Sequence, residues 1–324
     1  MKMKINHLTL FLTADCNMQC SYCFLGNKSR DIMSWETARK AVNLLDHNDG
    51  KKSVSFFGGE PLLQSELLFE IADYIRRGIG SEVNLSVTTN GVLLTPDMME
   101  KLQKYNIFVV LSLDGYGEEA NIHRKFPDGR KFWDVLEHNL SHIPTENIGA
   151  VRMTVVPSSV SELYYNFSML LLRGFDHINF ALDYASEWTN DDLEIYKSEF
   201  SKILQLYYEQ IAQKKKTCID FVDNIILNVT GGLKIGCRYG FGSVAVSAQG
   251  YVFPCHREVL DTVSGQGIPI DEFALNRSWK ESICTENHDE LCAQCDLFGR
   301  CTVCMAELKK WVEVWTVSLI WSAM

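Results

Sequence analysis

Eleven cysteines in 324 residues are the part of this sequence best suited to chemistry, and they fall into two groups. Three lie together in a C-x3-C-x2-C motif, and none follows for nearly two hundred residues. The other eight lie between positions 218 and 304. No secretory signal is visible, and an odd number of cysteines without one argues against a disulfide scaffold. The two groups of thiols therefore predict two metal-binding regions.

The first group consists of Cys16, Cys20 and Cys23, directly after a predicted strand. Three thiolates on one short loop can hold three irons of a cubane iron–sulfur cluster. The fourth iron is then open to the amine and carboxylate groups of a substrate or cofactor. Structural zinc would need a fourth protein ligand, and the nearest candidates, Asp15 and His7, lack a zinc-finger spacing. The motif favours an iron–sulfur cluster over a partial zinc site or three buried cysteines.

Alternating strands and helices position this loop. Apolar periodicity and cap residues predict six strand–helix units in the first two-thirds of the chain. The expected strands are Ile5–Thr13, Val54–Phe57, Val83–Thr88, Ile107–Leu113, Val151–Val156 and Ile178–Leu182. The expected helices run from Ser34 to about His47, over Leu62–Arg77, from Thr95 and Pro96 onward, over Phe132–Ile143 and Ser161–Arg173, and from Asp191 to about Lys214. This succession predicts a parallel sheet with ligands at the carboxyl ends of its strands.

Composition and charge narrow the function. The chain is 46% hydrophobic and 22% charged, as in ordinary globular proteins. No apolar run is long enough to span a membrane. The net charge of −10 argues against binding to nucleic-acid phosphates. We expect a cytoplasmic protein with no nucleic-acid or membrane partner. Glycines and cysteines crowd the chain after Lys216, so we predict domains at 1–216 and 217–324.

The first cysteine motif resembles the signature of the radical S-adenosylmethionine (SAM) superfamily. This resemblance extends over essentially the whole chain and implies an α/β fold, a partial (β/α)6 TIM-like barrel. Gly58-Gly59-Glu60, after the second strand, resembles the superfamily's GGE motif, which binds the SAM amino group. The resemblance assigns further SAM contacts to Tyr22 at the adenine, Asn90 after the third strand, and Ser112 and Arg124 at the carboxylate and ribose.

The second cysteine group resembles the SPASM domain, a small cysteine-rich extension that binds auxiliary iron–sulfur clusters in peptide- and protein-modifying enzymes. The resemblance implies two ligand sets, Cys237, Cys255 and Cys304 for one cluster, and Cys292, Cys295 and Cys301 for another. The last gap is one residue shorter than in the family, and no cysteine follows Cys304. Cys284 is the best candidate for a missing fourth thiolate and Cys218 a weaker one. One or two auxiliary [4Fe-4S] clusters are expected, with a zinc knuckle as the alternative.

The resemblance also implies a chemistry. A reduced [4Fe-4S] cluster splits SAM into methionine and a 5′-deoxyadenosyl radical, which takes a hydrogen atom from a peptide or protein substrate. A flavodoxin- or ferredoxin-like reductant would supply the electron. We expect a peptide maturase that installs a carbon–carbon or thioether cross-link in a ribosomally synthesised peptide (RiPP biosynthesis). The alternatives are an anaerobic sulfatase maturase that forms formylglycine, and a zinc-stabilised binding protein without enzymatic activity.

Asp183 and His256 are the candidate catalytic residues. Asp183 and Asn179 lie near the end of the sixth strand, and both are expected to line the cavity of the SAM site. His256 follows Cys255, where sulfatase maturases carry an aspartate base, and its imidazole can accept a proton near neutral pH. Because Cys16 comes so early, we expect no precursor-binding module ahead of the barrel. Any leader peptide would then be recognised by a separate protein or by another surface.

Overall fold

The structure is a computed structural model that describes residues 3–25, 28–45, 51–231, 240, 242–259 and 267–276. The chain divides into two compact units. Unit 1 contains Met1–Leu111, His123–Asn147 and Arg238–Thr285. Unit 2 contains Ser112–Ile122, Ile148–Cys237 and Glu286–Met324. The cysteine loop belongs to unit 1, and each unit is described by itself below.

Unit 1 is built on a mainly parallel sheet. Its strands are β1 (His7–Phe11), β2 (Lys52–Phe57), β3 (Val83–Thr89), β4 (Ile107–Ser112), β7 (Ser243–Val246), β8 (Tyr251–Phe253) and β9 (Ile268–Pro269). They are ordered β4-β3-β2-β1-β7-β8-β9, with β8 and β9 antiparallel to their neighbours. Leu10 pairs with Phe56 on one side and Val246 on the other. All three side chains are fully buried, as expected for a strand at the centre of a parallel sheet.

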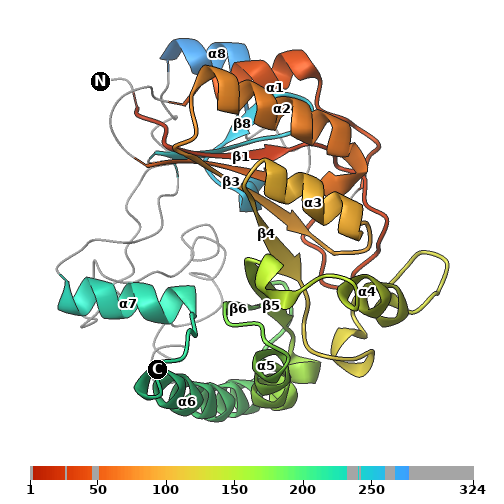
Figure 1. Ribbon diagram of the computed structural model, residues 1–324, viewed down its shortest axis with the longest axis vertical. Coiled ribbons are helices and arrows are strands. Elements are labelled where there is room, and N and C mark those ends of the chain that lie inside the picture. The colour runs from red at the N-terminus through yellow and green to blue at the C-terminus, as the bar shows by residue number, and fades with distance from the viewer. Residues whose placement is uncertain are drawn as a thin grey trace. The chain divides into compact units, whose positions relative to one another are not determined.

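Helices follow strands along the chain of unit 1. They are α1 (Trp35–Val42), α2 (Ser65–Gly78), α3 (Pro96–Lys104), α4 (Phe132–Leu140) and α8 (Ile270–Asn276), with 3-10 turns η1 (Pro61–Gln64), η3 (Thr145–Asn147) and η5 (His256–Glu258). The predicted start of α3 is confirmed, since the Thr95 hydroxyl accepts from the Met98 amide and Pro96 opens the helix. Figure 1 shows α1 and α2 side by side along the sheet, with α8 beyond α1.

The described residues of unit 2 form two parallel strands and three helices. These are β5 (Ala150–Val155), β6 (Ile178–Leu182), α5 (Leu163–Leu172), α6 (Asn190–Ala212) and α7 (Asp220–Thr230), with 3-10 turns η2 (Glu119–Asn121) and η4 (Pro157–Glu162). The core of this unit is aromatic. Phe180 of β6 lies 5.8 Å from Phe200 of α6 and 5.3 Å from Phe221 of α7, measured between ring centroids. These edge-on contacts hold both helices against β6.

The predicted fold class is confirmed as mixed α/β, with a parallel sheet that forms an open, partial barrel. All six predicted strands are present, within two residues of their expected bounds. The apolar run Ile107–Leu113 is typical of a strand in a buried parallel sheet, but burial alternates along β4 and Phe108 is 44% exposed. The helix α7 was not recognised in the region after Lys216. The predicted boundary near residue 217 stays a prediction.

None of the described helices is both long enough and apolar enough to cross a membrane. The predicted cysteine-rich region falls mostly outside the described residues. Six of its cysteines lie there, Cys237, Cys284, Cys292, Cys295, Cys301 and Cys304. Their predicted ligand roles therefore stay predictions.

Candidate functional site

The cysteine loop leaves the carboxyl end of β1 and is fixed first by its own polar side chains. The Thr13 hydroxyl donates to the Asp31 carbonyl at 2.8 Å and accepts from the Asp15 amide at 3.0 Å. One Asp15 carboxylate oxygen accepts from the Cys16 amide at 2.8 Å. These short-range bonds set the direction in which the first cysteine leaves the strand. Asp15, considered from the sequence as a zinc ligand, is used here as a backbone acceptor.

A second segment of unit 1 runs beside the loop and bonds to it through the backbone. The Gln19 amide donates to the Lys125 carbonyl at 2.7 Å, and the Ser21 amide donates to the His123 carbonyl at 2.9 Å. The side chains of Ser21 and His123 are also hydrogen-bonded, at 2.8 Å. These two backbone hydrogen bonds, called the ladder below, lie between Cys16 and Cys23 in the sequence. They hold the loop from the side, in addition to its attachment to β1.

The glycine pair after β2 allows that strand to approach the start of the loop. The Gly59 amide donates to the Thr13 carbonyl at 2.9 Å, and the Glu60 amide donates to the Asp15 carbonyl at 2.8 Å. A Cβ at Gly58 would lie 2.3 Å from the Thr13 carbonyl oxygen, and one at Gly59 would lie 2.1 Å from that of Asp15. Both distances are far below van der Waals contact. A glycine pair can let the backbone approach a ligand closely. Here it also lets the end of β2 approach the backbone of the cysteine loop.

Glu60 is a buried carboxylate that joins the ends of two strands. Its side chain accepts hydrogen bonds from the Leu62 amide at 3.0 Å, the Thr89 hydroxyl at 2.8 Å and the Asn90 amide at 2.8 Å. Burial raises the pKa of Glu60 to about 7, and these three donors oppose the rise. A group that titrates near neutral pH can respond strongly to a positive charge brought close to it.

Asn90, predicted to contact SAM, also touches the cysteine loop. Its side-chain nitrogen, Nδ2, donates to the Asn17 side-chain oxygen at 2.7 Å and lies 4.0 Å from the Cys16 sulfur. Its own side-chain oxygen accepts from the Val92 amide at 2.9 Å. The carboxyl end of β3 and the cysteine loop are thereby joined within unit 1.

Tyr22 and Arg124, the predicted adenine and SAM-polar contacts, lie together. The Arg124 guanidinium carbon is 5.6 Å from the centre of the Tyr22 ring, within the range of a cation–π contact. The His123 ring lies 6.1 Å from the same ring. Arg124 is buried, and its neighbours in the chain form the ladder with the cysteine loop. One short segment therefore fixes the loop and places the arginine.

The three loop cysteines suit an iron–sulfur cluster. All are partly buried and none is in a disulfide. Burial raises the pKa of the Cys16 thiol to about 11, and the positive charge of Lys28 partly offsets this. The Lys28 amine donates to the Met18 carbonyl inside the loop. A bare Cys16 would be protonated at neutral pH, so a bound iron would displace that proton. Three sulfur donors on one loop fit the ligand chemistry of such clusters.

Cys255 and His256 follow β8 in unit 1. The His256 ring lies 5.5 Å from the ring of Phe57, the last residue of β2, at an angle of 51°. Its Nδ1 is 3.7 Å from the Cys255 sulfur. Phe57 packs on an apolar group that includes Phe11, Leu25, Ala245, Phe253 and Val259, with Cys23 and Phe24 at its edge. The candidate base therefore lies next to the strand that ends in the glycine pair, and its catalytic role stays a prediction.

The remaining predicted site residues belong to unit 2. Ser112 is the last residue of β4 and is partly buried. Asp183, just after β6, accepts hydrogen bonds in its carboxylate from the Ser186 hydroxyl at 2.6 Å and the Ala185 amide at 3.2 Å. Both are local turn contacts, which give Asp183 a structural use beside its predicted catalytic one. The roles of Ser112 and Asp183 stay predictions.

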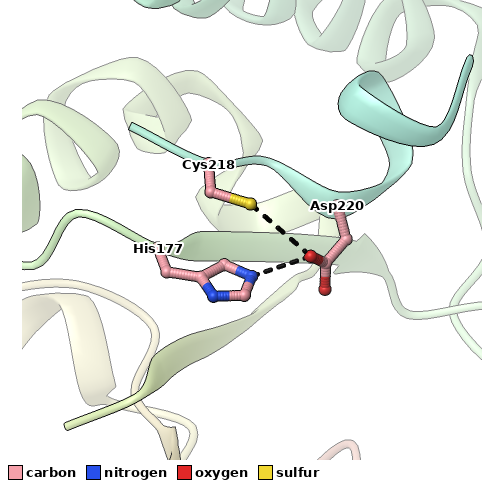
Figure 2. Close-up of side chains that lie close together, drawn as sticks. All are labelled: His177, Cys218 and Asp220. Carbon is pink, nitrogen blue, oxygen red and sulfur yellow. Dashed lines mark hydrogen bonds and ion pairs between the residues drawn. The ribbon is translucent and has the colours of Figure 1, made fainter. Parts of the chain in front are cut away.

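Cys218 and Asn179 belong to another group, which the sequence did not reveal. In unit 2 the Cys218 sulfur lies 3.6 Å from an Asp220 carboxylate oxygen, and His177 Nε2 lies 2.8 Å from the same oxygen. Figure 2 shows the three side chains turned toward one another. Asn179, expected to line a substrate cavity, instead bonds to Asp220 through both ends of its amide, at 2.7 Å each.

Sequence reasoning also missed the residues that support the cysteine loop, among them Thr13, Asn17 and the ladder segment at His123 and Lys125. Thr13 and Asp15 carry a detectable signal, because short polar side chains at a strand end often bond to the neighbouring backbone. The ladder carries none, since its bonds come from backbone groups that every residue has.

Comparisons with known proteins show which family and which enzymes this chain is similar to. Residues 10–162 match the family model described as the Radical SAM superfamily. Over 127 residues the chain is 33% identical to the uncharacterized protein MJ0907 of Methanocaldococcus jannaschii, a match of 39% of this chain and 44% of that one. It is 25% identical to the radical SAM cyclopropyl synthase TigE of Paramaledivibacter caminithermalis (95% and 69%). It is also 25% identical to a cysteine-type anaerobic sulfatase-maturating enzyme of Clostridium perfringens (77% and 73%).

Solved structures share the fold. The enzyme anSMEcpe with bound AdoMet and Cp18Cys peptide superposes with a TM-score of 0.74 at 20% identity, over 99% of each chain. SuiB of Streptococcus suis bound to its precursor peptide SuiA gives a TM-score of 0.64 at 16% identity, over 95% of this chain and 73% of that one. At these identities the likeness concerns the fold alone.

Proposed function

Because residues 10–162 of this chain form a radical SAM domain whose homologues are enzymes, we propose that it abstracts a hydrogen atom from a peptide side chain. The product we propose is an oxidative cross-link, carbon–carbon or thioether, in a ribosomally synthesised peptide. Cys16, Cys20 and Cys23 would hold a [4Fe-4S] cluster, which would supply the electron that cleaves SAM. An external one-electron reductant would reduce that cluster.

The observation that supports this proposal most is the way the three free cysteines are held. The loop is bonded to the Gly59 and Glu60 backbone on one side and to the His123 and Lys125 carbonyls on the other. Such a frame keeps three sulfurs in place before any cofactor binds, which reduces the ordering cost of binding. A structural zinc site is closed by four protein ligands, so it needs no open coordination position for a cofactor.

We assign the SAM contacts to residues around this frame. Glu60, with its pKa raised to about 7, would pair with the SAM ammonium group, whose charge favours the ionised carboxylate. Tyr22 offers an aromatic face for the adenine, and Arg124 beside it offers a guanidinium for a carboxylate or hydroxyl. Asn90 would hold the loop and the ligand at once. Ser112 is retained as a SAM contact on the sequence resemblance.

A peptide or protein is the proposed substrate, because the relatives point to this class. A sulfatase-maturating enzyme is among the similar sequences, and some of the similar structures hold peptides, among them Cp18Cys in anSMEcpe and SuiA in SuiB. The cysteines from Cys237 to Cys304 are proposed to hold one or two auxiliary [4Fe-4S] clusters. One of these would accept the second electron of the oxidation.

Formylglycine formation is the second candidate, and the position of His256 favours it. This imidazole packs against Phe57, directly before the glycine pair of the proposed SAM site. A base is needed there to remove a proton from an oxidising cysteine or serine side chain, and histidine can do so near neutral pH. In this reading His256 takes the place of the aspartate found in sulfatase maturases.

One experiment separates the candidates. Anaerobically reconstituted protein is incubated with SAM, a reductant and one of two peptides, and 5′-deoxyadenosine and peptide mass are measured together. A genome-neighbouring precursor peptide that becomes lighter by two hydrogens would support the cross-link. An aldehyde on a cysteine-containing sulfatase-motif peptide would support formylglycine formation. Unchanged peptides, under conditions where SAM is cleaved, would count against both.

A further inference from the structure

Three chemically active side chains meet in unit 2, and one of them, His177, lies about forty positions before the other two in the sequence. His177 immediately precedes β6, Cys218 lies on the segment paired with it, and Asp220 is the first residue of α7 (Figure 2). One ligand atom from each, the His177 nitrogen, the Cys218 sulfur and an Asp220 oxygen, lies within 4.8 Å of the other two. None of the three is used by the proposed radical chemistry.

The backbone fixes this arrangement. His177 and Cys218 form a parallel bridge, in which the Cys218 amide donates to the Asp176 carbonyl at 2.8 Å and the Ile178 amide donates to the Cys218 carbonyl at 3.0 Å. Residues paired in this way present their side chains on the same face of a sheet. The histidine and the cysteine are therefore neighbours because of the fold.

Asn179 orients the carboxylate of the group. Its side-chain nitrogen donates to Asp220 Oδ2 at 2.7 Å, and its side-chain oxygen accepts from the Asp220 amide at 2.7 Å. The other carboxylate oxygen, Oδ1, is left directed at His177 Nε2 and Cys218 Sγ. Carboxylates that bind metal ions are commonly held by hydrogen bonds of this kind.

Charge in the neighbourhood favours a cation. An Asp220 carboxylate oxygen lies 2.8 Å from His177 Nε2. The Asp223 carboxylate accepts from the Ile219 amide at 2.9 Å, one residue after Cys218. Negative charge in this region therefore exceeds the single positive charge that His177 can carry. A bound divalent cation would balance it.

We propose that His177 Nε2, Cys218 Sγ and Asp220 Oδ1 bind one Zn²⁺ ion, with a water molecule as the fourth ligand. Nitrogen, sulfur and oxygen donors together are a typical zinc set. On binding, the Cys218 thiol releases its proton to solvent and His177 binds as the neutral imidazole. The Asp220 side chain is 57% exposed, which leaves the fourth position open to water.

The distances are compatible with such an ion. Tetrahedral zinc, with bonds of about 2.0 Å to oxygen and about 2.3 Å to sulfur, holds these two atoms about 3.5 Å apart. The observed separation of Cys218 Sγ and Asp220 Oδ1 is 3.6 Å. The His177–Asp220 pair, at 2.8 Å, would open by about 0.5 Å to reach the nitrogen–oxygen separation in the same geometry. The ion would join β6, the paired segment and the start of α7.

Zinc content of the cluster-loaded protein tests the proposal. The protein is reconstituted with iron and sulfide, exposed to an equimolar amount of Zn²⁺, desalted, and analysed for both metals. We expect about one zinc per chain, and at least tenfold weaker zinc binding in Cys218→Ser and His177→Ala at unchanged iron content. His138→Ala, which removes an exposed histidine of α4, serves as the matched control and should keep its zinc. Equal zinc in Cys218→Ser and wild type would overturn the proposal.

Two further measurements do not depend on the folding of a variant. Zinc X-ray absorption of the wild-type protein should show one sulfur scatterer with nitrogen and oxygen at shorter distances, whereas an all-sulfur shell would overturn the proposal. Added Zn²⁺ should also raise the melting temperature of the wild type. A melting temperature that does not respond to Zn²⁺ would mean that His177 and Asp220 form only an ion pair. Neither measurement requires SAM cleavage, so failure here is distinct from failure of the proposed function.

Discussion

The cysteine loop of unit 1 and the histidine–cysteine–aspartate group of unit 2 show two ways of assembling ligand atoms. The loop brings three thiols together within eight residues, from Cys16 to Cys23. The other group joins residues about forty positions apart, through a parallel bridge between His177 and Cys218. Spacing in the sequence reveals the first kind of site. The second kind becomes visible only when the pairing of strands is known.

The two regions also differ in what holds them. Backbone hydrogen bonds and two glycines fix the loop, so its geometry depends on close approach of the main chain. In unit 2 a side chain, Asn179, orients the carboxylate ligand. Changes at the two glycines should therefore act through sterics, and changes at Asn179 through single polar contacts.

The largest effect is expected at Gly59. A Cβ at this position would lie 2.1 Å from the Asp15 carbonyl oxygen, so Gly59→Ala should force the cysteine loop away from β2. We expect a loss of about 3 kcal/mol in the free energy of unfolding, as for severe overpacking, and a loss of about four irons per chain, the content of the loop's cubane cluster. Urea unfolding and iron analysis measure the two effects.

The matched control is Gly78→Ala, at the end of α2, where a Cβ would meet nothing within 4 Å. This variant should be as stable as the wild type, or slightly more stable, because alanine restricts the unfolded chain. Equal stability and equal iron content in the two variants would show that β2 does not position the loop as described.

The next effect concerns Glu60 and pH. Its pKa, ordinarily 4.5, is raised by burial to about 7 in the folded protein. The folded state therefore holds a proton that the unfolded state has released, and stability should fall as pH rises from about 4.5 to about 7. The loss is at most about 3 kcal/mol, at 1.36 kcal/mol per pKa unit. Unfolding at pH 5 and pH 7.5, without SAM, measures it.

Glu60→Gln removes the titrating group and should flatten this part of the pH dependence. Glu66→Gln, at an exposed glutamate in the first turn of α2, should leave the slope unchanged. If Glu60→Gln kept the wild-type slope, the carboxylate would be ionised throughout this pH range, and burial would not control its charge.

A smaller effect is expected at Asn17, which joins the cysteine loop to the end of β3. Asn17→Ala removes its 2.7 Å hydrogen bond with Asn90, a contact of about 1 kcal/mol. Deoxyadenosine formation should fall several-fold with iron content intact. Asn84→Ala, at an exposed position of the same strand, should have full activity. Full activity in Asn17→Ala would instead mean that the backbone bonds alone position the loop.

The smallest effect should be confined to unit 2. Thr189 caps α6 in a capping box with Asp192, and Thr189→Ala should lower the free energy of unfolding by about 1 kcal/mol. Iron binding and zinc binding should both be unaffected, because the cap touches neither group of ligands. A loss of either metal in this variant would show that the sites depend on overall stability, and not on the local contacts that distinguish them.

Much of the fold was predictable because local signals agree. Apolar strands, the Thr95–Pro96 helix start and the glycine-terminated helices each indicate the same α/β order that the structure shows. The helix α7 was missed because it follows directly after a lysine-rich segment in a region dominated by glycine and cysteine. The burial alternation in β4 was missed because Phe108 is apolar yet partly exposed, and hydrophobicity alone does not assign a face.

The site was predictable where chemistry follows from side-chain type and spacing, as in the three loop cysteines and the glycine pair. The ladder to His123 and Lys125 was not, because carbonyl groups leave no mark in a sequence. Cys218 was considered as a cluster ligand by counting cysteines. Its contacts with Asp220 and its pairing with His177 depend on a strand pairing that no count of residues contains.

The most direct test of the central claim is the formation of 5′-deoxyadenosine by reduced, anaerobically reconstituted protein with SAM. The wild type should form it, and Cys16→Ala/Cys20→Ala/Cys23→Ala should form none, while losing about four irons per chain, the content of one cubane cluster. Deoxyadenosine from the triple variant, or none from an iron-loaded wild type, would contradict the assignment of SAM cleavage to this loop.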